Sequence, residues 1–267
     1  MAAGMRGVSS EYRDEIIRPQ SPKPVMDPEE CWKSLESKIL AGNIAMDMGR
    51  VRNAFEYAVK LHEGQKRRDG SPYVTHCVAT AEIIAEQGLD EDSVVAALLH
   101  DVIEDTPATH EDVRRQFGST VADIVEGVCI EDTDSTYDDI ARNFGPTVAS
   151  LVEGVTKLTR VQYTSHEDEQ AENLRKMLIA MAKDIRVILI KIADRLHNMR
   201  TMDYQSGEKQ LIKSAETMEI YAPIAHRLGM QKIKWELEDR SLYYLDREGY
   251  KEITDALSTR MDTLRVF

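Results

Sequence analysis

The sequence predicts an all-α fold, and three observations support this prediction. The chain of 267 residues has 6% aromatic residues, 14 Gly and 8 Pro, a composition that favours helices over β-sandwiches or barrels. From residue 51 onward, apolar residues recur at spacings of three and four, as in VRNAFEYAVKLH. Asp and Thr residues that can cap the start of a helix precede several of these segments.

The net charge of −13 argues against general nucleic-acid binding, because protein surfaces that bind nucleic acids are basic. A polyanionic substrate must then be received by a metal or by a local basic patch, and QKRR at 65–68 is such a patch. The longest apolar runs, VVAALL and VILI, are far too short to cross a membrane. Three widely spaced cysteines, Cys31, Cys77 and Cys129, form no disulfide framework or zinc spacing. We therefore expect a cytoplasmic protein without membrane contact.

The chain is expected to divide into three parts. Residues 1–27 mix Pro, Ser and charge without a periodic apolar face, which indicates a flexible leader. The main domain is expected over 28–205, and further amphipathic helices over 206–267, with Gly229 as a helix stop between two of them.

One segment is ambiguous between strand and helix. The stretch IRVILIKIADRLHNMRT, residues 185–201, begins with β-branched residues that also suit a buried strand. No convincing partner strand exists, so the segment is predicted as a buried helix whose Asp194, His197 and Asn198 share a polar face.

The stretch LLHDVIEDT, residues 98–106, places His100, Asp101, Glu104 and Asp105 directly after an apolar run. Helical spacing puts all four side chains on one face. Buried carboxylates need either cations or a metal ion, and the local cations are Arg114 and Arg115 in the following segment. The residues alone leave a metal site and a solvated acidic helix end both open.

A tandem repeat follows. Residues 103–128 align without gaps with residues 130–155, and 16 of 26 positions are identical. Each copy holds a Thr-x-x-Asp capping signal and a Phe-Gly stop, which predicts a helical hairpin. In the second copy, Gly127 and Val128 stand at the positions that match the His-Asp pair. The first copy is therefore expected to lie at the functional site, and Glu131 and Asp132 are expected to be non-catalytic. The alternative is that the second copy docks in its place and displaces the first.

Four stretches in order, YVTHCV, LLHDVIEDT, LVEGVTKLTR and MAKDIRVILIKIADRLHNMRT, closely resemble the hydrolase domain of the RelA/SpoT-type alarmone enzymes over about residues 45–250. The stretch YAPIAHRLGMQKIKWELEDRSLYYLD resembles the region that leads toward the synthetase domain in long members. The resemblance implies the N-terminal hydrolase region of a long bifunctional member, with a synthetase domain elsewhere in the full-length protein, or a form without that domain.

The resemblance implies an HD-domain phosphohydrolase helical bundle that converts ppGpp or pppGpp to GDP or GTP and pyrophosphate with Mn²⁺. Mixed imidazole and carboxylate ligands suit Mn²⁺. The motif positions carried over as metal ligands are His76, His100, Asp101 and Asp194.

The resemblance also assigns residues around the metal. Glu104 and Asp105 would orient and deprotonate the attacking water. Arg67 and Arg68 match positions that contact the guanine and the phosphates, and Asn198 and Thr201 match nucleoside-binding positions. The remaining histidines match no ligand position and are expected to be structural or on the surface: His62, His110, His166, His197 and His226. Of these, His197 is a candidate neighbour of the metal ligands.

The sequence departs from the family pattern at three places. Cys77 follows His76 where members commonly have Pro, and Asp69 follows the paired arginines where they have a small hydroxyl residue. Asp69 could weaken phosphate binding by charge repulsion. The family also has a single unit in place of the two hairpins. Two alternatives therefore stay open: a hydrolase of another phosphorylated nucleotide such as NADPH, and a regulatory module that binds nucleotide without turnover.

Overall fold

The chain is described by a computed structural model over residues 27–42, 45–129 and 184–265, with side chains as far as residue 256. These residues form helices and no strand, apart from one isolated bridge between Lys66 and Pro72. The all-α prediction is therefore confirmed for them. The chain divides into two compact units, here called the first unit (Met26–His197) and the second unit (from Asn198).

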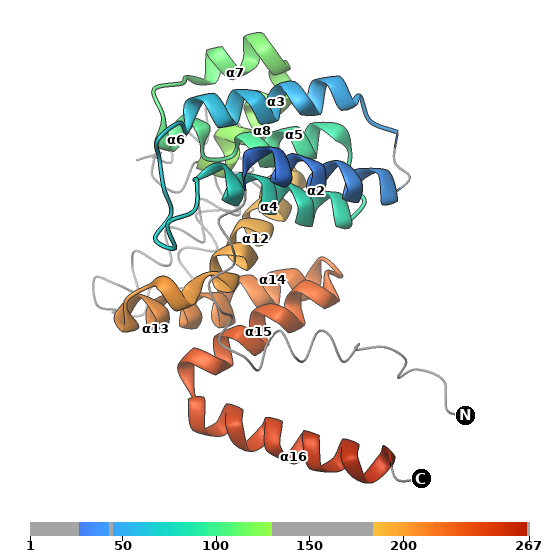
Figure 1. The fold of residues 1–267 in the computed structure, drawn as a ribbon, viewed down its shortest axis with the longest axis vertical. Helices are drawn as coiled ribbons and strands as arrows, with labels where there is room; N and C mark the ends of the chain where they lie inside the picture. The colour runs from blue at the N-terminus through green and yellow to red at the C-terminus, as the bar shows by residue number, and fades with distance from the viewer. Residues whose placement is uncertain (1–26, 43–44, 130–183, 266–267) are drawn as a thin grey trace, which may run out of the picture. The chain divides into compact units, whose positions relative to one another are not determined.

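The first unit is built around α5 (Glu91–Leu99), which packs against α3, α4 and α8. Every residue from Ser93 to Leu99 is buried, because the apolar run has no polar face to turn toward solvent. The other helices of this unit, shown in Figure 1, are α2 (Pro28–Ala41), α3 (Met48–Leu61), α4 (Val74–Glu86), α6 (Val102–Asp105), α7 (His110–Phe117), α8 (Ser119–Cys129) and α12 (Ile185–Arg200), whose last residues belong to the second unit.

Helix starts follow the capping signals in the sequence. Asp27 and Glu30 form a capping box at the start of α2, where folded structure was expected to begin. The side chain of Asp90 accepts a hydrogen bond from the Ser93 amide at the start of α5 (3.1 Å). Thr109 and Asp112 form the capping box of α7.

The expectation of one helical face from His100 to Asp105 is wrong in one respect, because the helix is interrupted. Helix α5 ends at Leu99 and α6 begins at Val102. The His100 ring donates a hydrogen bond from Nδ1 to the carbonyl of Ala97 (2.9 Å), which a continuing helix would offer to the amide of Asp101. The His-Asp pair therefore lies at a junction of two helices.

The first repeat forms the predicted helical hairpin. Gly118 lies between α7 and α8 with φ of 93°, a value that favours glycine. A Cβ atom on Gly127 would lie 2.7 Å from Cγ2 of Val187, so α8 and α12 approach closely where Gly127 lacks a side chain. The second copy, residues 130–155, lies outside the described residues.

The ambiguous segment 185–201 forms the predicted buried helix, α12. Val187, Ile188, Ile190, Ile192 and Leu196 are all buried on it. The β-branched character of the valine and the isoleucines is overridden by packing, since the described residues supply no sheet that this segment could join.

The second unit is a separate set of helices after α12. Gly229, with φ of 76°, separates α14 from α15 as predicted. Glu236 is buried and accepts hydrogen bonds from Arg200 (2.7 and 2.6 Å) and Arg240 (2.8 Å). The elements are η2 (Met202–Tyr204), α13 (Gly207–Glu216), the π-helical turn η3 (Thr217–Tyr221), α14 (Ala222–Arg227), α15 (Gln231–Leu245) and α16 (Arg247–Arg265).

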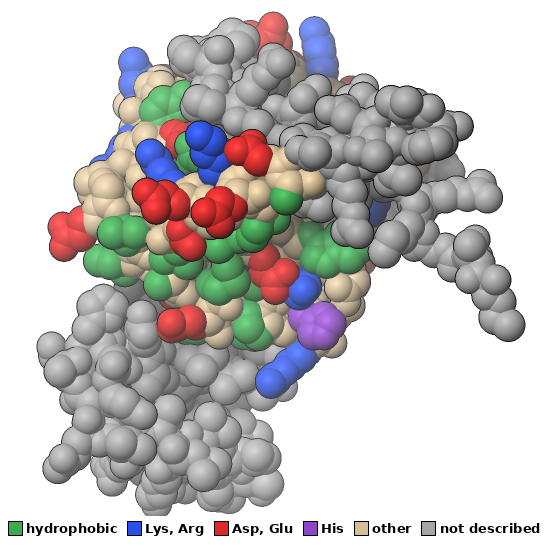
Figure 2. Space-filling view, turned by 90° about the horizontal axis from the view of Figure 1, so that it is seen from below, with side chains coloured by type: hydrophobic (Ala, Val, Ile, Leu, Met, Phe, Trp, Pro, Cys, Tyr) green, Lys and Arg blue, Asp and Glu red, His purple; other side chains and the backbone are tan. Residues whose placement is uncertain are grey.

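One face of the described surface is mixed in character. On the face shown in Figure 2, the described side chains mix acidic, basic and apolar types, and they form no continuous basic surface there. Among the helices that the structure describes, none combines the length and hydrophobicity needed to cross a membrane.

Candidate metal centre

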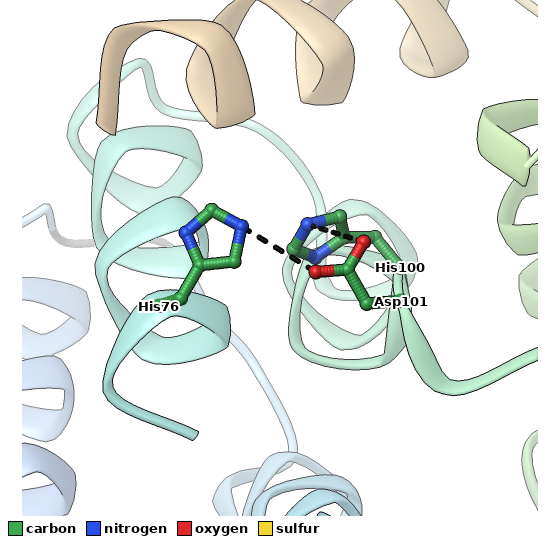
Figure 3. A group of neighbouring side chains, drawn as sticks. All are labelled: His76, His100 and Asp101. Carbon is green, nitrogen blue, oxygen red and sulfur yellow. Dashed lines mark ion pairs between the residues drawn. The ribbon is translucent and has the colours of Figure 1, made fainter. Parts of the chain in front are cut away.

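The structure brings the four predicted metal ligands together from distant parts of the chain. His76 comes from α4, His100 and Asp101 from the junction of α5 and α6, and Asp194 from α12. His76 Nε2 lies 3.4 Å from Asp101 Oδ2 and 3.0 Å from Asp194 Oδ1. His100 Nε2 lies 3.1 Å from Asp101 Oδ1 and 3.9 Å from Asp194 Oδ1. Figure 3 shows both imidazoles directed toward the Asp101 carboxylate. We call these four residues the ligand cluster.

The His100 ring is prepared to bind a cation through Nε2. Its Nδ1 donates to the Ala97 carbonyl, so in the neutral ring the proton is on Nδ1 and Nε2 carries a lone pair. His100 is 1% exposed, and its Nε2 has no hydrogen-bond partner of acceptable geometry among the described residues. A buried lone pair that faces two carboxylates requires a positive charge, which either a proton or a metal ion can supply.

In the metal-free protein, the charges within the cluster strongly shift the pKa values of His100 and the two carboxylates. Burial lowers the pKa of His100, but the charges of Asp101 and Asp194 outweigh it and raise that pKa to about 9. Burial raises the pKa of Asp194, but the imidazoles of His76 and His100 outweigh it and lower that pKa to about 2. The pKa of Asp101 is held well below its ordinary value in the same way. Both carboxylates are therefore ionised at neutral pH, as metal ligands must be.

The alternative of pairing with the nearby arginines is not used. Arg114 lies 3.3 Å from Glu111 and Arg115 lies 2.9 Å from Asp112, both within α7. Two imidazoles and two carboxylates from three segments make a mixed N,O set that can hold a divalent first-row cation.

Tyr73 is a contact of the cluster that the sequence reasoning missed. Its hydroxyl donates to Asp101 Oδ2 (2.8 Å), and its ring stacks on His62 (4.7 Å between centroids). Burial, followed by the charge of Asp101, raises the pKa of Tyr73 far above its ordinary value, so the hydroxyl stays protonated. Its position three residues before His76 was the available signal, because i and i+3 face the same way on a helix.

The predicted catalytic carboxylates lie beside the cluster on α6. Glu104 and Asp105 are both exposed to solvent, where water can reach them. The backbone carbonyl of Asp105 accepts a hydrogen bond from Gln65 (2.9 Å), whose other amide atom contacts His62 (2.8 Å). The turn that carries these acids is therefore tied to the loop before α4.

The predicted basic residues lie on that loop. Arg68 is exposed, and the guanidinium of Arg67 lies 6.0 Å from the Tyr73 ring centroid. The Asp69 carboxylate accepts hydrogen bonds from the amide (2.9 Å) and hydroxyl (2.6 Å) of Ser71. Asp69 thus stabilises the loop turn.

The predicted nucleoside-binding residues belong to the second unit. Asn198 lies in the last turn of α12 and Thr201 directly after that helix. The Thr201 hydroxyl donates to the Asn198 carbonyl (3.3 Å). Their role in nucleoside binding stays a prediction.

An all-helical bundle that gathers a His, a His-Asp pair and a distant Asp defines the class of metal-dependent HD hydrolases. The HD domain family matches residues 54–130 and 128–231 of this chain, two segments that meet at the junction between the repeats. The chain belongs to the HD domain family.

Within this family, the chain is similar to proteins of guanosine tetraphosphate metabolism. The chain is 46% identical over 211 residues to a GTP pyrophosphokinase of Streptomyces coelicolor, covering 79% of this chain and 22% of that protein. It is 45% identical over 208 residues to the bifunctional (p)ppGpp synthase/hydrolase SpoT of Escherichia coli, covering 78% and 26%. It is 44% identical over 207 residues to a guanosine-3′,5′-bis(diphosphate) 3′-pyrophosphohydrolase of Haemophilus influenzae, covering 76% and 27%.

These relatives confirm the RelA/SpoT-type resemblance. The chain spans about a quarter of their length.

Proposed function

We propose that this chain is a Mn²⁺-dependent hydrolase that releases pyrophosphate from the 3′ position of ppGpp or pppGpp and leaves GDP or GTP. The main support for a metal site is the buried His100 Nε2 atom. It faces Asp101 and Asp194 and has no hydrogen-bond partner among the described residues. The names of the relatives support this substrate class.

The ligand cluster would hold the metal. When bound, Mn²⁺ would polarise a phosphoryl oxygen and lower the pKa of a water molecule. The water oxygen bonds to the phosphorus next to the ribose, the bond from that phosphorus to the ribose 3′ oxygen breaks, and the 3′ oxygen takes a proton. The exposed carboxylates of Glu104 and Asp105 orient the water and accept its proton.

The remaining roles concern substrate placement. Arg67 and Arg68 would meet the guanine and the phosphates, because a planar guanidinium both stacks and binds phosphate. Asn198 and Thr201 would bind the nucleoside. The loop turn held by Asp69 and Ser71 supports the presentation of both arginines.

The wider assignment is part of the same proposal. A cytoplasmic location agrees with the free cysteines Cys31, Cys77 and Cys129. We place a leader at 1–27, the hydrolase domain at 28–205 and C-terminal helices at 206–267. The name of the bifunctional relative SpoT supports a synthetase region elsewhere in the full-length protein.

The second copy of the repeat favours one further candidate, a nucleotide-binding regulatory module that has lost turnover. The site lies directly beside the first hairpin, since Cys129 at the end of α8 donates to the His100 carbonyl (3.1 Å). A change in how the first hairpin packs would therefore reach the cluster.

A hydrolysis assay separates these candidates. Purified chain is incubated with ppGpp and Mn²⁺, and pyrophosphate release is followed by ³¹P NMR, with Asp194→Ala as the inactive control. Pyrophosphate and GDP in equal amounts are expected from the wild-type chain. Tight ppGpp binding without release would instead support the regulatory module, and preferential turnover of NADPH would move the substrate to another phosphorylated nucleotide.

A further inference from the structure

Helix α12 contacts both ring nitrogens of His76. Asp194 Oδ1 lies 3.0 Å from His76 Nε2, and His197 Nδ1 lies 2.7 Å from His76 Nδ1. Asp194 and His197 are three residues apart, so they share a face of the helix. One helical turn of α12 therefore brackets a single imidazole of α4.

The contact between the two histidines requires a fixed arrangement of protons. A hydrogen bond between two Nδ1 atoms needs a proton on one of them and a lone pair on the other. A histidine that binds metal through Nε2 carries its ring proton on Nδ1. Because His76 Nε2 is the nitrogen that faces Asp101 and Asp194, His76 must be the donor in the metal-bound state and His197 the acceptor.

We propose that His197 is a positioning residue of the metal centre. It accepts a hydrogen bond from the Nδ1–H group of His76 and so keeps the Nε2 lone pair directed at the metal position. The ring centroids lie 4.9 Å apart with an interplanar angle of 37°, which fixes the plane of the His76 ring. The inference rests on the metal site of the proposed function.

The second histidine of the cluster, His100, also has a hydrogen-bond acceptor at Nδ1, but here the acceptor is a backbone carbonyl. His100 Nδ1 donates to the Ala97 carbonyl, which leaves its Nε2 free for a cation. An acceptor behind a metal-binding imidazole holds its tautomer and its orientation. Both imidazoles of the cluster thus have an acceptor at Nδ1, and His197 is the one that substitution can remove.

Two variants separate hydrogen-bond acceptance from packing. In His197→Asn the amide oxygen can still accept a hydrogen bond from His76 Nδ1, whereas His197→Leu keeps more of the side-chain volume and has no acceptor. Mn²⁺ affinity of the nucleotide-free chain is measured by isothermal titration calorimetry. His197→Leu is expected to bind Mn²⁺ about 10- to 100-fold more weakly, and His197→Asn close to wild type. His226→Leu, at an exposed histidine of α14, is the control and should leave the affinity unchanged.

A spectroscopic readout reports the tautomer directly. Long-range ¹H–¹⁵N correlation spectra of the chain loaded with diamagnetic Zn²⁺ should show the His76 proton on Nδ1 in the wild type and in His197→Asn. Equal Mn²⁺ affinity in His197→Leu and wild type would overturn the inference, as would equal losses in both variants. A wild-type chain that binds no Mn²⁺ would overturn it together with the metal site, whereas Mn²⁺ binding without ppGpp hydrolysis would overturn only the hydrolase function.

Discussion

The Tyr73 hydroxyl donates a hydrogen bond to Asp101 Oδ2 at 2.8 Å. Asp101 also lies within 3.4 Å of His76 Nε2 and 3.1 Å of His100 Nε2, so one carboxylate is oriented from three sides. Outer contacts of this kind hold a metal-binding carboxylate in place.

Tyr73→Phe should therefore weaken Mn²⁺ binding about 10-fold or more, because it removes the hydrogen bond and keeps the ring that stacks on His62. Calorimetric titration of the nucleotide-free variant with Mn²⁺ measures this. Tyr57→Phe, at a tyrosine on α3 whose ring contacts Phe117, is the matched control. Unchanged affinity in Tyr73→Phe would show that the hydroxyl does not position Asp101.

The raised pKa of His100 makes the stability of the metal-free protein depend on pH. Its pKa is about 9 in the folded state against an ordinary value of 6.5, so the protonated ring stabilises the fold fully below about pH 6.5 and this contribution is lost as pH rises through 9. The melting temperature in EDTA should therefore fall between pH 6.5 and 9.

Mn²⁺ should reverse that trend, because it must displace the proton from His100 and binds more tightly as pH rises. Differential scanning fluorimetry with saturating MnCl₂ should show a growing stabilisation over the same pH range. A stabilisation by Mn²⁺ that shrinks toward pH 9, without precipitation, would contradict ligation by His100.

Asp194 and Glu104 are expected to have separable roles. Asp194→Ala should abolish Mn²⁺ binding, because Asp194 contacts both imidazoles of the cluster. Glu104→Ala should keep metal and nucleotide binding but lose on the order of 10² or more in kcat, as expected for a general base. Metal titration and steady-state hydrolysis of both variants test the division, and equal loss of metal in the two would refute it.

The two hairpin copies can be compared through their acidic pairs. Glu104→Gln/Asp105→Asn should abolish ppGpp hydrolysis, because α6 directly follows the His-Asp pair. Glu131→Gln/Asp132→Asn, the matching pair in the second copy, should leave it intact. Hydrolysis rates under saturating Mn²⁺ give the answer, and activity lost only in the second variant would mean that the second copy supplies the catalytic acids.

Substituting one glycine in each copy of the repeat tests which copy packs on α12. Gly127→Ala should destabilise the fold by about 1–3 kcal/mol, because the added Cβ would lie 2.7 Å from Cγ2 of Val187. Gly154→Ala makes the same change in the second copy and should cost less. Urea unfolding measures both, and a larger loss in Gly154→Ala would place the second hairpin against Val187.

The sequence by itself determined the helical fold and predicted which residues would form the ligand cluster. Apolar spacing, the caps at Asp27, Asp90 and Thr109, and the stop at Gly118 are local signals, and the structure follows them. Such signals work because a helix forms hydrogen bonds between residues four apart. The family motifs likewise singled out His76, His100 and Asp194 together.

Only the tertiary structure decided how these residues meet. The break between α5 and α6 coincides with a side-chain hydrogen bond from His100 to Ala97, which helical periodicity does not reveal. His76 and His197 are 121 residues apart in the chain, yet their Nδ1 atoms lie within 2.7 Å. Neither Tyr73 nor His197 matches a ligand position, and the roles proposed for them rest on the packing of α4 and α12 around one cluster of charges. Spacing in sequence orders side chains along one helix, whereas a metal centre is set by distances between helices.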